Sequence, residues 1–387
     1  KDFPSQLSFR DVLERGDEFL EAYPRRSPLW RFLSYSTSLL TFGVSKLLLF
    51  TCYNVKLNGF EKLETALERS KRENRGLMTV MNHMSMVDDP LVWATLPYKL
   101  FTSLDNIRWS LGAHNICFQN KFLANFFSLG QVLSTERFGV GPFQGSIDAS
   151  IRLLSPDDTL DLEWTPHSEV SSSLKKAYSP PIIRSKPSWV HVYPEGFVLQ
   201  LYPPFENSMR YFKWGITRMI LEATKPPIVV PIFATGFEKI ASEAVTDSMF
   251  RQILPRNFGS EINVTIGDPL NDDLIDRYRK EWTHLVEKYY DPKNPNDLSD
   301  ELKYGKEAQD LRSRLAAELR AHVAEIRNEV RKLPREDPRF KSPSWWKRFN
   351  TTEGKSDPDV KVIGENWAIR RMQKFLPPEG KPKGKDD

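Results

Sequence analysis

The stretch GLMTVMNHMSMVDDP, residues 76–90, contains a buried strand, a loop and the start of a helix. The run 77–81 is short, mostly apolar and of strand length. Asp89 followed by Pro90 is a favourable N-cap followed by a favourable first helical residue, so we expect a helix to begin there. In open α/β sheets, ligands bind at the carboxyl ends of strands. The stretch therefore predicts an α/β fold with a site where this strand ends.

His83 and Asp88 lie between the strand and the helix. In one continuous helix, side chains five residues apart would point ~140° away from each other. With His83 closing the strand and Asp88 just outside the helix, the loop can fold the carboxylate onto the imidazole. A neutral imidazole accepts a proton near pH 7, and a carboxylate on its other nitrogen fixes the tautomer. The pair therefore predicts a general base.

The motif brings no obvious nucleophile of its own. Ser85 could serve, but no Gly-x-Ser-x-Gly elbow surrounds it, so a hydroxyl of the substrate is the favoured nucleophile. The spacing alone is weak support for catalysis. On spacing alone, the favoured interpretation is a buried structural histidine beside a helix-start carboxylate.

Further blocks of sequence favour the catalytic interpretation of His83 over the structural one. The chain resembles the glycerolipid acyltransferases with a His-x4-Asp motif over about residues 30–270, through NHMSMVDDP (82–90), GQVLSTERFG (130–139), WVHVYPEG (189–196), RYFKWGITRMI (210–220) and PPIVVPIFATGFEKI (226–240). Two departures stand out: Tyr193 replaces the Phe that commonly precedes Pro-Glu-Gly in the family, and a Pro- and Ser-rich segment at 155–187 interrupts the core.

This resemblance implies an α/β fold with a mixed central sheet flanked by helices, in which His83, Arg137 and Glu195 converge at strand ends. His83 would be the catalytic base and Asp88 its orienting partner. The arginine would bind substrate phosphate, for which a guanidinium fork is suited; the alternative is a loop arginine paired with Glu136. The implied substrate-binding set is Asn82, Ser85, Arg137, Tyr193, Pro194, Glu195, Gly196, Arg210 and Lys213.

The chain most resembles the mitochondrial phospholipid–lysophospholipid transacylases of that family. They imply acyl transfer from a phospholipid such as phosphatidylcholine to a lysophospholipid such as monolysocardiolipin, without coenzyme A and without a metal. The implied location is the mitochondrial membranes that face the intermembrane space. Two alternatives remain open, namely an acyl-CoA-dependent acyltransferase and a non-catalytic membrane-bound scaffold.

Composition fits a globular protein. The 387 residues carry a net charge of +4, which permits contact with anionic surfaces but does not argue for nucleic acid. Cys52 and Cys117 are the only cysteines and lie in apolar surroundings, so we expect small buried hydrophobes. No Cys/His spacing indicates zinc. The first 19 residues contain too many acidic side chains for a transit peptide.

Residues 29–53 form the most apolar stretch, within an N-terminal segment 1–57. Arg31 and Lys46 bracket 14 uncharged residues, which is short of the roughly 20 apolar residues of a membrane span. We therefore expect an interfacial or re-entrant helix that binds one leaflet, with a buried core helix as the alternative. A second apolar run, 114–129, is expected to pack against the core.

The remaining divisions follow composition. The acyltransferase core is expected over 58–270, with a strand at 228–233 beside the Glu195 strand and an insertion at about 155–187 in which His167 is solvent-exposed. A helical region, 271–333, would end in one long helix at 306–333, whose narrow apolar stripe either packs along the protein or pairs as a coiled coil, leaving self-association open. The Pro- and charge-rich segment 334–387 is expected to be mobile, apart from the Trp345–Trp346 cluster, which would touch a bilayer or the enzyme itself.

Overall fold

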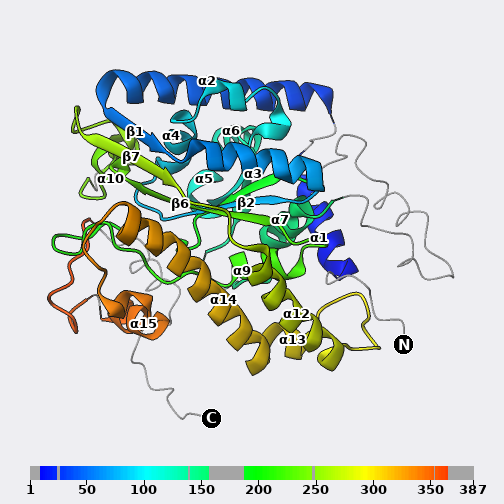
Figure 1. The fold of residues 1–387 in the computed structure, drawn as a ribbon. Helices are drawn as coiled ribbons and strands as arrows, with labels where there is room; N and C mark the ends of the chain where they lie inside the picture. The colour runs from blue at the N-terminus through cyan, green and yellow to red at the C-terminus, as the bar shows by residue number, and fades with distance from the viewer. Residues whose placement is uncertain are drawn as a thin grey trace, which may run out of the picture.

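The computed structural model describes residues 9–23, 27–137, 140–156, 187–245, 249–352 and 354–364. Its centre is a seven-stranded sheet in the order β1-β7-β6-β2-β5-β3-β4 (Figure 1). The strands are β1 (Asn54–Asn58), β2 (Leu77–Met81), β3 (Trp109–Ala113), β4 (Val132–Thr135), β5 (Trp189–Val192), β6 (Ile228–Thr235) and β7 (Glu261–Ile266). Neighbours run parallel except β6 and β7, which are antiparallel. The mixed α/β sheet predicted from the sequence is confirmed.

Strand β2 lies at the centre of the sheet, between β5 and β6. Every residue of β2 and β5 is buried, which explains why Leu77–Met81 is mostly apolar and does not alternate. The expected pairing of the 228–233 strand with the Glu195 strand is wrong, because β2 separates β6 from β5. Since β2 and β5 are parallel neighbours, their carboxyl ends meet at one edge, and His83 and Glu195 follow those ends.

Helices cover both faces of the sheet. Figure 1 shows α2, α4 and α6 above the sheet and α9, α12 and α14 below it. The helices are α1 (Arg10–Glu21), α2 (Pro28–Cys52), α3 (Phe60–Glu73), α4 (Asp88–Ala94), α5 (His114–Cys117), α6 (Lys121–Leu129), α7 (Gly145–Leu154), α9 (Gly215–Glu222), α10 (Phe237–Ile240), α11 (Met249–Ile253), α12 (Asp272–Tyr289), α13 (Asp300–Tyr304), α14 (Lys306–Glu325) and α15 (Pro343–Thr351).

Helix α2 runs along the outside of the molecule (Figure 1). In the described part of the chain it alone is long and apolar enough to cross a membrane by length and composition. Its Lys46 ammonium turns inward and donates to the carbonyl oxygens of Ala94 and Leu96 at 2.9 and 2.8 Å. Its outward side chains are large and apolar, namely Leu29, Phe32, Leu33, Leu40, Val44, Leu47 and Phe50. The Lys46 ammonium therefore faces the protein, and the exposed side chains of α2 are uncharged and mostly apolar.

Helix α6 contradicts the expectation of a core-packing helix. It packs against α2, yet none of its residues is fully buried and the Phe122 side chain is 77% exposed. The apolar periodicity of 114–129 correctly indicates an apolar face, but it does not say what covers that face. Cys117 and Cys52 are both free and only partly buried, which corrects the expectation that they are buried hydrophobes.

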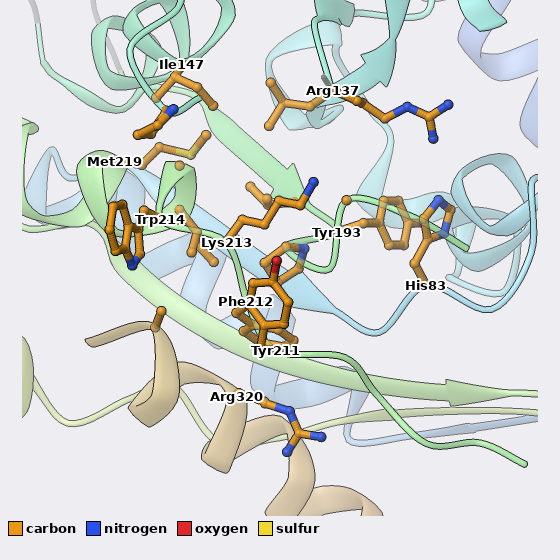
Figure 2. Close-up of a pocket in the computed structure, with 18 of the residues that line it drawn as sticks. His83, Arg137, Ile147, Tyr193, Tyr211, Phe212, Lys213, Trp214, Met219 and Arg320 are labelled. Carbon is orange, nitrogen blue, oxygen red and sulfur yellow. The ribbon is translucent and has the colours of Figure 1, made fainter. Parts of the chain in front are cut away.

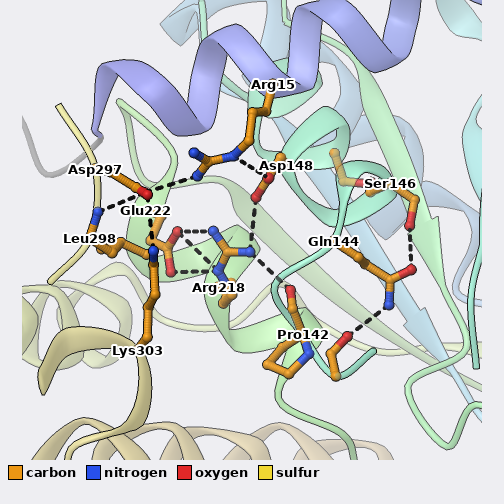
Figure 3. A network of polar contacts seen from close by, with 12 residues as sticks. Arg15, Pro142, Gln144, Ser146, Asp148, Arg218, Glu222, Asp297, Leu298 and Lys303 are labelled. Carbon is orange, nitrogen blue, oxygen red and sulfur yellow. Dashed lines mark hydrogen bonds and ion pairs between the residues drawn. The ribbon is translucent and has the colours of Figure 1, made fainter. Parts of the chain in front are cut away.

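The N-terminal helix α1 packs against α7 and joins a buried ionic network (Figure 3). Arg218 pairs with Glu222 at 2.6 Å and with Asp148 at 2.9 Å, and Arg15 bridges Asp148 to Asp297. Both carboxylates beside Arg218 raise the pKa of its guanidinium, although burial opposes them. The guanidinium also donates to the Pro142 carbonyl, so the network fixes the loop that precedes α7.

The C-terminal region is folded against the core. The α-helix of the predicted 306–333 element ends at Glu325 and continues as a π-helical turn, Ile326–Val330. Its apolar stripe packs along the protein body, which decides between the two arrangements left open. In the tail expected to be mobile, Pro338–Lys341 form a 3-10 turn with Phe340 buried. The Trp345–Trp346 cluster, for which contact with a bilayer or with the enzyme was left open, packs against the enzyme, with Trp346 and Phe349 buried. Residues 365–387 lie outside the described residues.

The structure also differs from the sequence analysis at β3 and at the start of α4. Strand β3, which follows two short 3-10 turns and leads directly into α5, was missed because its short run has no clear alternation. The helix after His83 begins at Asp88, two residues earlier than expected, with Val87 at the N-cap position in place of Asp89. Of the insertion at 155–187, residues 157–186, with His167, lie outside the described residues.

Candidate active site

A cavity of about 890 Å³ opens at the carboxyl edge of the sheet. Figure 2 shows His83 and Tyr193 on one side, Lys213 in the middle, and Trp214, Met219 and Ile147 on the other. Polar and cationic side chains therefore surround the His83 end, and apolar side chains line the far end. Helix α14 forms a further wall with Ser313, Ala316, Ala317, Arg320, Ala321 and Ala324.

His83 and Asp88 are brought together by the loop between β2 and α4. The Nδ1 atom of His83 lies 2.9 Å from Oδ2 of Asp88, whose side chain is fully buried. The same oxygen accepts the backbone N–H groups of Met84 and Ser85. Burial raises the pKa of Asp88, and its hydrogen bond with His83 opposes that rise. Because three donors converge on one oxygen, the carboxylate cannot turn away from the imidazole.

The His83 ring is also held by an aromatic neighbour. Tyr193 stacks on it with ring centroids 4.4 Å apart, and His191 meets Tyr193 edge-on. His191 is buried, lies 2.8 Å from the Thr79 hydroxyl and has its pKa lowered to about 3 by burial. His191 is therefore a neutral, buried side chain with a structural role behind Tyr193. Tyr193 replaces the Phe of the family and keeps the planar surface on which the imidazole rests.

Glu195 accepts hydrogen bonds from backbone rather than facing the cavity. Its Oε1 accepts the His83 N–H at 2.8 Å and its Oε2 accepts the Arg210 N–H at 2.7 Å. Burial raises the pKa of Glu195 to about 7. The carboxylate is 1% exposed and does not line the cavity. The expectation that it contacts substrate is thus corrected, since both oxygens join two chain segments of the site.

Two cations approach the cavity from different elements. Arg137 follows β4 and lies 3.3 Å from the Asn115 side-chain oxygen, and its guanidinium lies over the Phe197 ring at 5.4 Å. The Lys213 ammonium lies over the same ring at 4.1 Å. Burial lowers the pKa of Lys213 to about 7, and Arg210 and Arg137 add to this by repulsion. Such a grouping of positive charge in a partly apolar cavity favours an anionic ligand.

Pro194 and Gly196 shape the turn that carries Glu195. Gly196 has φ +74°, and a Cβ there would lie 2.8 Å from the Lys213 ammonium nitrogen. This position therefore favours glycine, because the backbone is left-handed and the Lys213 side chain approaches closely. The Pro194 carbonyl accepts the Lys213 N–H at 2.9 Å, so this turn also places Lys213.

Three members of the predicted set lie behind the cavity surface. Asn82 is fully buried and exchanges two hydrogen bonds with the Ala234 backbone at 2.9 Å. Ser85 is fully buried and donates to the Ala241 carbonyl, so its hydroxyl is not available as a nucleophile. The Arg210 guanidinium lies over the Trp346 ring at 4.4 Å and does not line the cavity. Their expected contact with substrate is therefore corrected to a supporting position.

Some residues around the site gave little signal in the sequence. Asp89 pairs with the buried Arg108, accepts the Trp93 indole N–H and so fixes the start of α4. The α14 wall was missed because its alanines looked like ordinary helix residues between the leucines. Among the described residues, no group of three or more His, Cys, Asp and Glu side chains could hold a metal ion.

Comparison with known proteins agrees with this geometry. An acyltransferase family model matches residues 55–235. The chain is 29% identical over 252 residues to the Dictyostelium discoideum protein named taffazin, covering 64% of this chain and 70% of that protein. It is 29% identical over 207 residues to Drosophila melanogaster tafazzin, covering 53% of this chain and 43% of that protein.

Two other proteins extend the comparison. An N-acylphosphatidylethanolamine synthase of Arabidopsis thaliana is 28% identical over 208 residues, covering 54% of this chain and 60% of that protein. The 1-acyl-sn-glycerophosphate acyltransferase structure from Thermotoga maritima has a TM-score of 0.35 at 13% identity and covers 72% of this chain and 94% of that one. Residues 55–235 thus match an acyltransferase domain, and the chain is an acyltransferase that is similar to the proteins named tafazzin.

Proposed function

We propose that the protein is a coenzyme A-independent transacylase that moves an acyl chain from a phospholipid to a lysophospholipid. The donor would be a phospholipid such as phosphatidylcholine and the acceptor monolysocardiolipin, on the mitochondrial membranes facing the intermembrane space. The relatives named tafazzin support this choice. The observation that carries the proposal is the position of His83. Its imidazole is hydrogen-bonded to the buried Asp88 carboxylate and lines a cavity that Lys213 and Arg137 also line.

In the proposed mechanism the imidazole acts as a general base. Asp88 accepts a hydrogen bond from Nδ1–H, which leaves the Nε2 lone pair for the hydroxyl of the lysophospholipid. As Nε2 takes that proton, the hydroxyl oxygen bonds to the carbonyl carbon of the donor ester. The tetrahedral intermediate then breaks the bond to the donor's glycerol oxygen, which receives the proton back from His83. Atoms and charge balance in this scheme without any cofactor.

The two ends of the cavity suit the two parts of a lipid. Arg137 and Lys213 would bind the phosphate of the headgroup, where a guanidinium fork and an ammonium are good partners. The apolar end, with Ile147, Trp214 and Met219, would hold an acyl chain away from water. One lipid could therefore place its ester near His83 while both of its ends are bound.

The test is acyl exchange in vesicles that contain phosphatidylcholine with a labelled acyl chain. Labelled product from monolysocardiolipin with no coenzyme A present is expected from the wild-type protein. Adding acyl-CoA with a single lysolipid tests the acyl-CoA-dependent alternative. Phosphatidylethanolamine as sole acceptor tests transfer to an amine, the acceptor suggested by the name of the Arabidopsis relative.

Matched histidine variants make the test specific to the site. His83→Ala should abolish exchange, while His284→Ala, an exposed histidine on α12, should leave it unchanged. Activity only when acyl-CoA is supplied would overturn the proposed donor. Exchange by His83→Ala at the wild-type rate would overturn the proposed mechanism.

A further inference from the structure

Two buried charged residues beyond the family match form an ion pair beside the site. Arg320 on α14 and Glu336, which follows that helix, form an ion pair at 2.9 Å with both side chains almost fully buried. The acyltransferase family model ends at residue 235. A buried ion pair gives little net stability by itself, because desolvation offsets the attraction. The role of the Arg320–Glu336 pair is therefore inferred from the backbone groups that the two side chains bind.

The pair holds one short stretch of backbone. Arg320 donates to the carbonyl oxygens of Arg210 and Met209 at 2.8 and 2.7 Å. Glu336 Oε1 accepts the Met209 N–H at 2.5 Å. Three backbone groups at 209–210 are thus bound by two side chains of the C-terminal region.

That stretch of backbone is one carboxylate away from the proposed base. The Arg210 N–H donates to Glu195, and the other oxygen of Glu195 accepts the His83 N–H. A continuous series of hydrogen bonds therefore runs from Arg320 and Glu336, through the 209–210 backbone and Glu195, to the backbone of His83.

We propose that Arg320 and Glu336 are positioning residues that set the place of His83 through the 209–210 backbone and Glu195. This inference rests on the proposed function, because it assumes that His83 is the base. It makes the C-terminal region a working part of the site, although it lies outside the matched family domain.

The charges around Glu195 are consistent with this arrangement. The charged groups that face it are His83, Arg210 and Arg320, which come from three different elements. Burial raises the pKa of Glu195, while the two backbone N–H donors and the charges of His83 and Arg320 oppose that rise. Loss of the arginine would therefore favour a protonated Glu195, which is a poorer acceptor for two N–H groups.

A second, indirect connection between the C-terminal region and the His83 loop runs through residues 199–200 and supports the same inference. The Leu199 N–H donates to the His83 carbonyl at 3.1 Å, and the Gln200 side chain donates to the Met84 carbonyl. The Gln200 carbonyl in turn accepts the Ile363 N–H at 2.8 Å. The His83 peptide is therefore held on both sides by segments that the C-terminal region braces.

Glu336 is the better residue to vary, because Arg320 lines the cavity and Glu336 does not. Glu336→Ala should lower kcat by about 10–100-fold, as expected when a catalytic group is displaced by a remote change. KM for the lysolipid should change by less than about twofold, since no substrate contact is lost. Glu336→Gln keeps an oxygen acceptor and should restore most of kcat.

The matched control is Glu281→Ala on α12. It breaks an exposed ion pair with Arg314, which lies on α14 as Arg320 does. Folded fractions are measured by thermal unfolding and used to correct every rate. A Glu336→Ala protein that melts earlier but keeps the wild-type kcat per folded molecule would overturn the inference. Failure of His83→Ala to lose activity would instead overturn the proposed function, so the two results are separable.

Discussion

Asp88 Oδ2 lies 2.9 Å from Nδ1 of His83 and also accepts the backbone N–H groups of Met84 and Ser85 in the same loop. An ionised carboxylate has no proton to donate, so the hydrogen of this pair sits on Nδ1. The Nε2 atom then carries the lone pair. The buried carboxylate therefore decides which nitrogen of His83 can accept a proton.

The first prediction concerns this pair. His83→Ala should lower acyl transfer by at least about 10²–10⁴-fold, the usual contribution of general base catalysis. Asp88→Asn should be nearly as damaging, because an amide at this position permits the wrong tautomer of the imidazole. Initial rates of labelled acyl exchange measure both effects, with circular dichroism as the check on folding. Near-normal turnover by either variant would remove the pair from the mechanism.

Arg137 should depend on the shape of its charged group. Arg137→Lys keeps the positive charge but replaces a planar fork by a point charge, so transfer at low lysolipid concentration should fall markedly. The measurement is kcat/KM over a range of lysolipid concentrations. If Arg137→Lys matches the wild type throughout, Arg137 is a loop arginine with no role in phosphate binding.

Lys213 gives a prediction about pH. Because burial lowers its pKa to about 7, the ammonium is charged below that pH and loses its proton as the pH rises through it. If the charged form binds lipid phosphate, KM for the lysolipid should rise above about pH 7. Lys213→Arg stays protonated over this range and should remove the rise. A KM that is flat from pH 6 to pH 9 in the wild type would contradict the assignment.

The exposed apolar face of α2 and α6 should bind the membrane. Leu40→Asp and Phe122→Asp, at side chains 69% and 77% exposed, should each weaken vesicle binding roughly tenfold or more, because burying such a side chain is worth about 1.5–3 kcal/mol. The matched control is Tyr304→Asp, an exposed aromatic on α13 at the opposite side of the molecule. Vesicle flotation measures the effect. Equal loss in all three variants would show that the face has no special role.

The attachment of α2 should leave both chain termini on one side of the membrane. The helix turns Lys46 onto carbonyl oxygens at the end of α4, and that contact would be broken if α2 left the body to span a bilayer. We expect detergent, but not high salt or carbonate, to release the protein. Protease access to tags at both ends in sealed vesicles tests the topology. Tags on opposite sides would show that α2 spans the membrane.

Local sequence determined the elements of the site. The apolar run of β2, the turn at Gly196 and the short loop to Asp88 depend on residues close together in the chain, and each was predictable from its own stretch. The order of the motif blocks along the chain, compared with that in the family, then predicted that these elements lie together in one site. For these parts, short-range geometry leaves the chain few alternatives.

Tertiary structure alone decided which of the predicted polar residues face the cavity. Asn82, Ser85 and Glu195 look like ligands in the sequence, yet each is buried and hydrogen-bonded to a backbone group more than 100 residues away in the chain. In the same way, the sequence showed that α6 has an apolar face and that Trp346 lies in an aromatic cluster. Only packing left the first exposed and buried the second under Arg210, because periodicity records what a face is made of and not what lies against it.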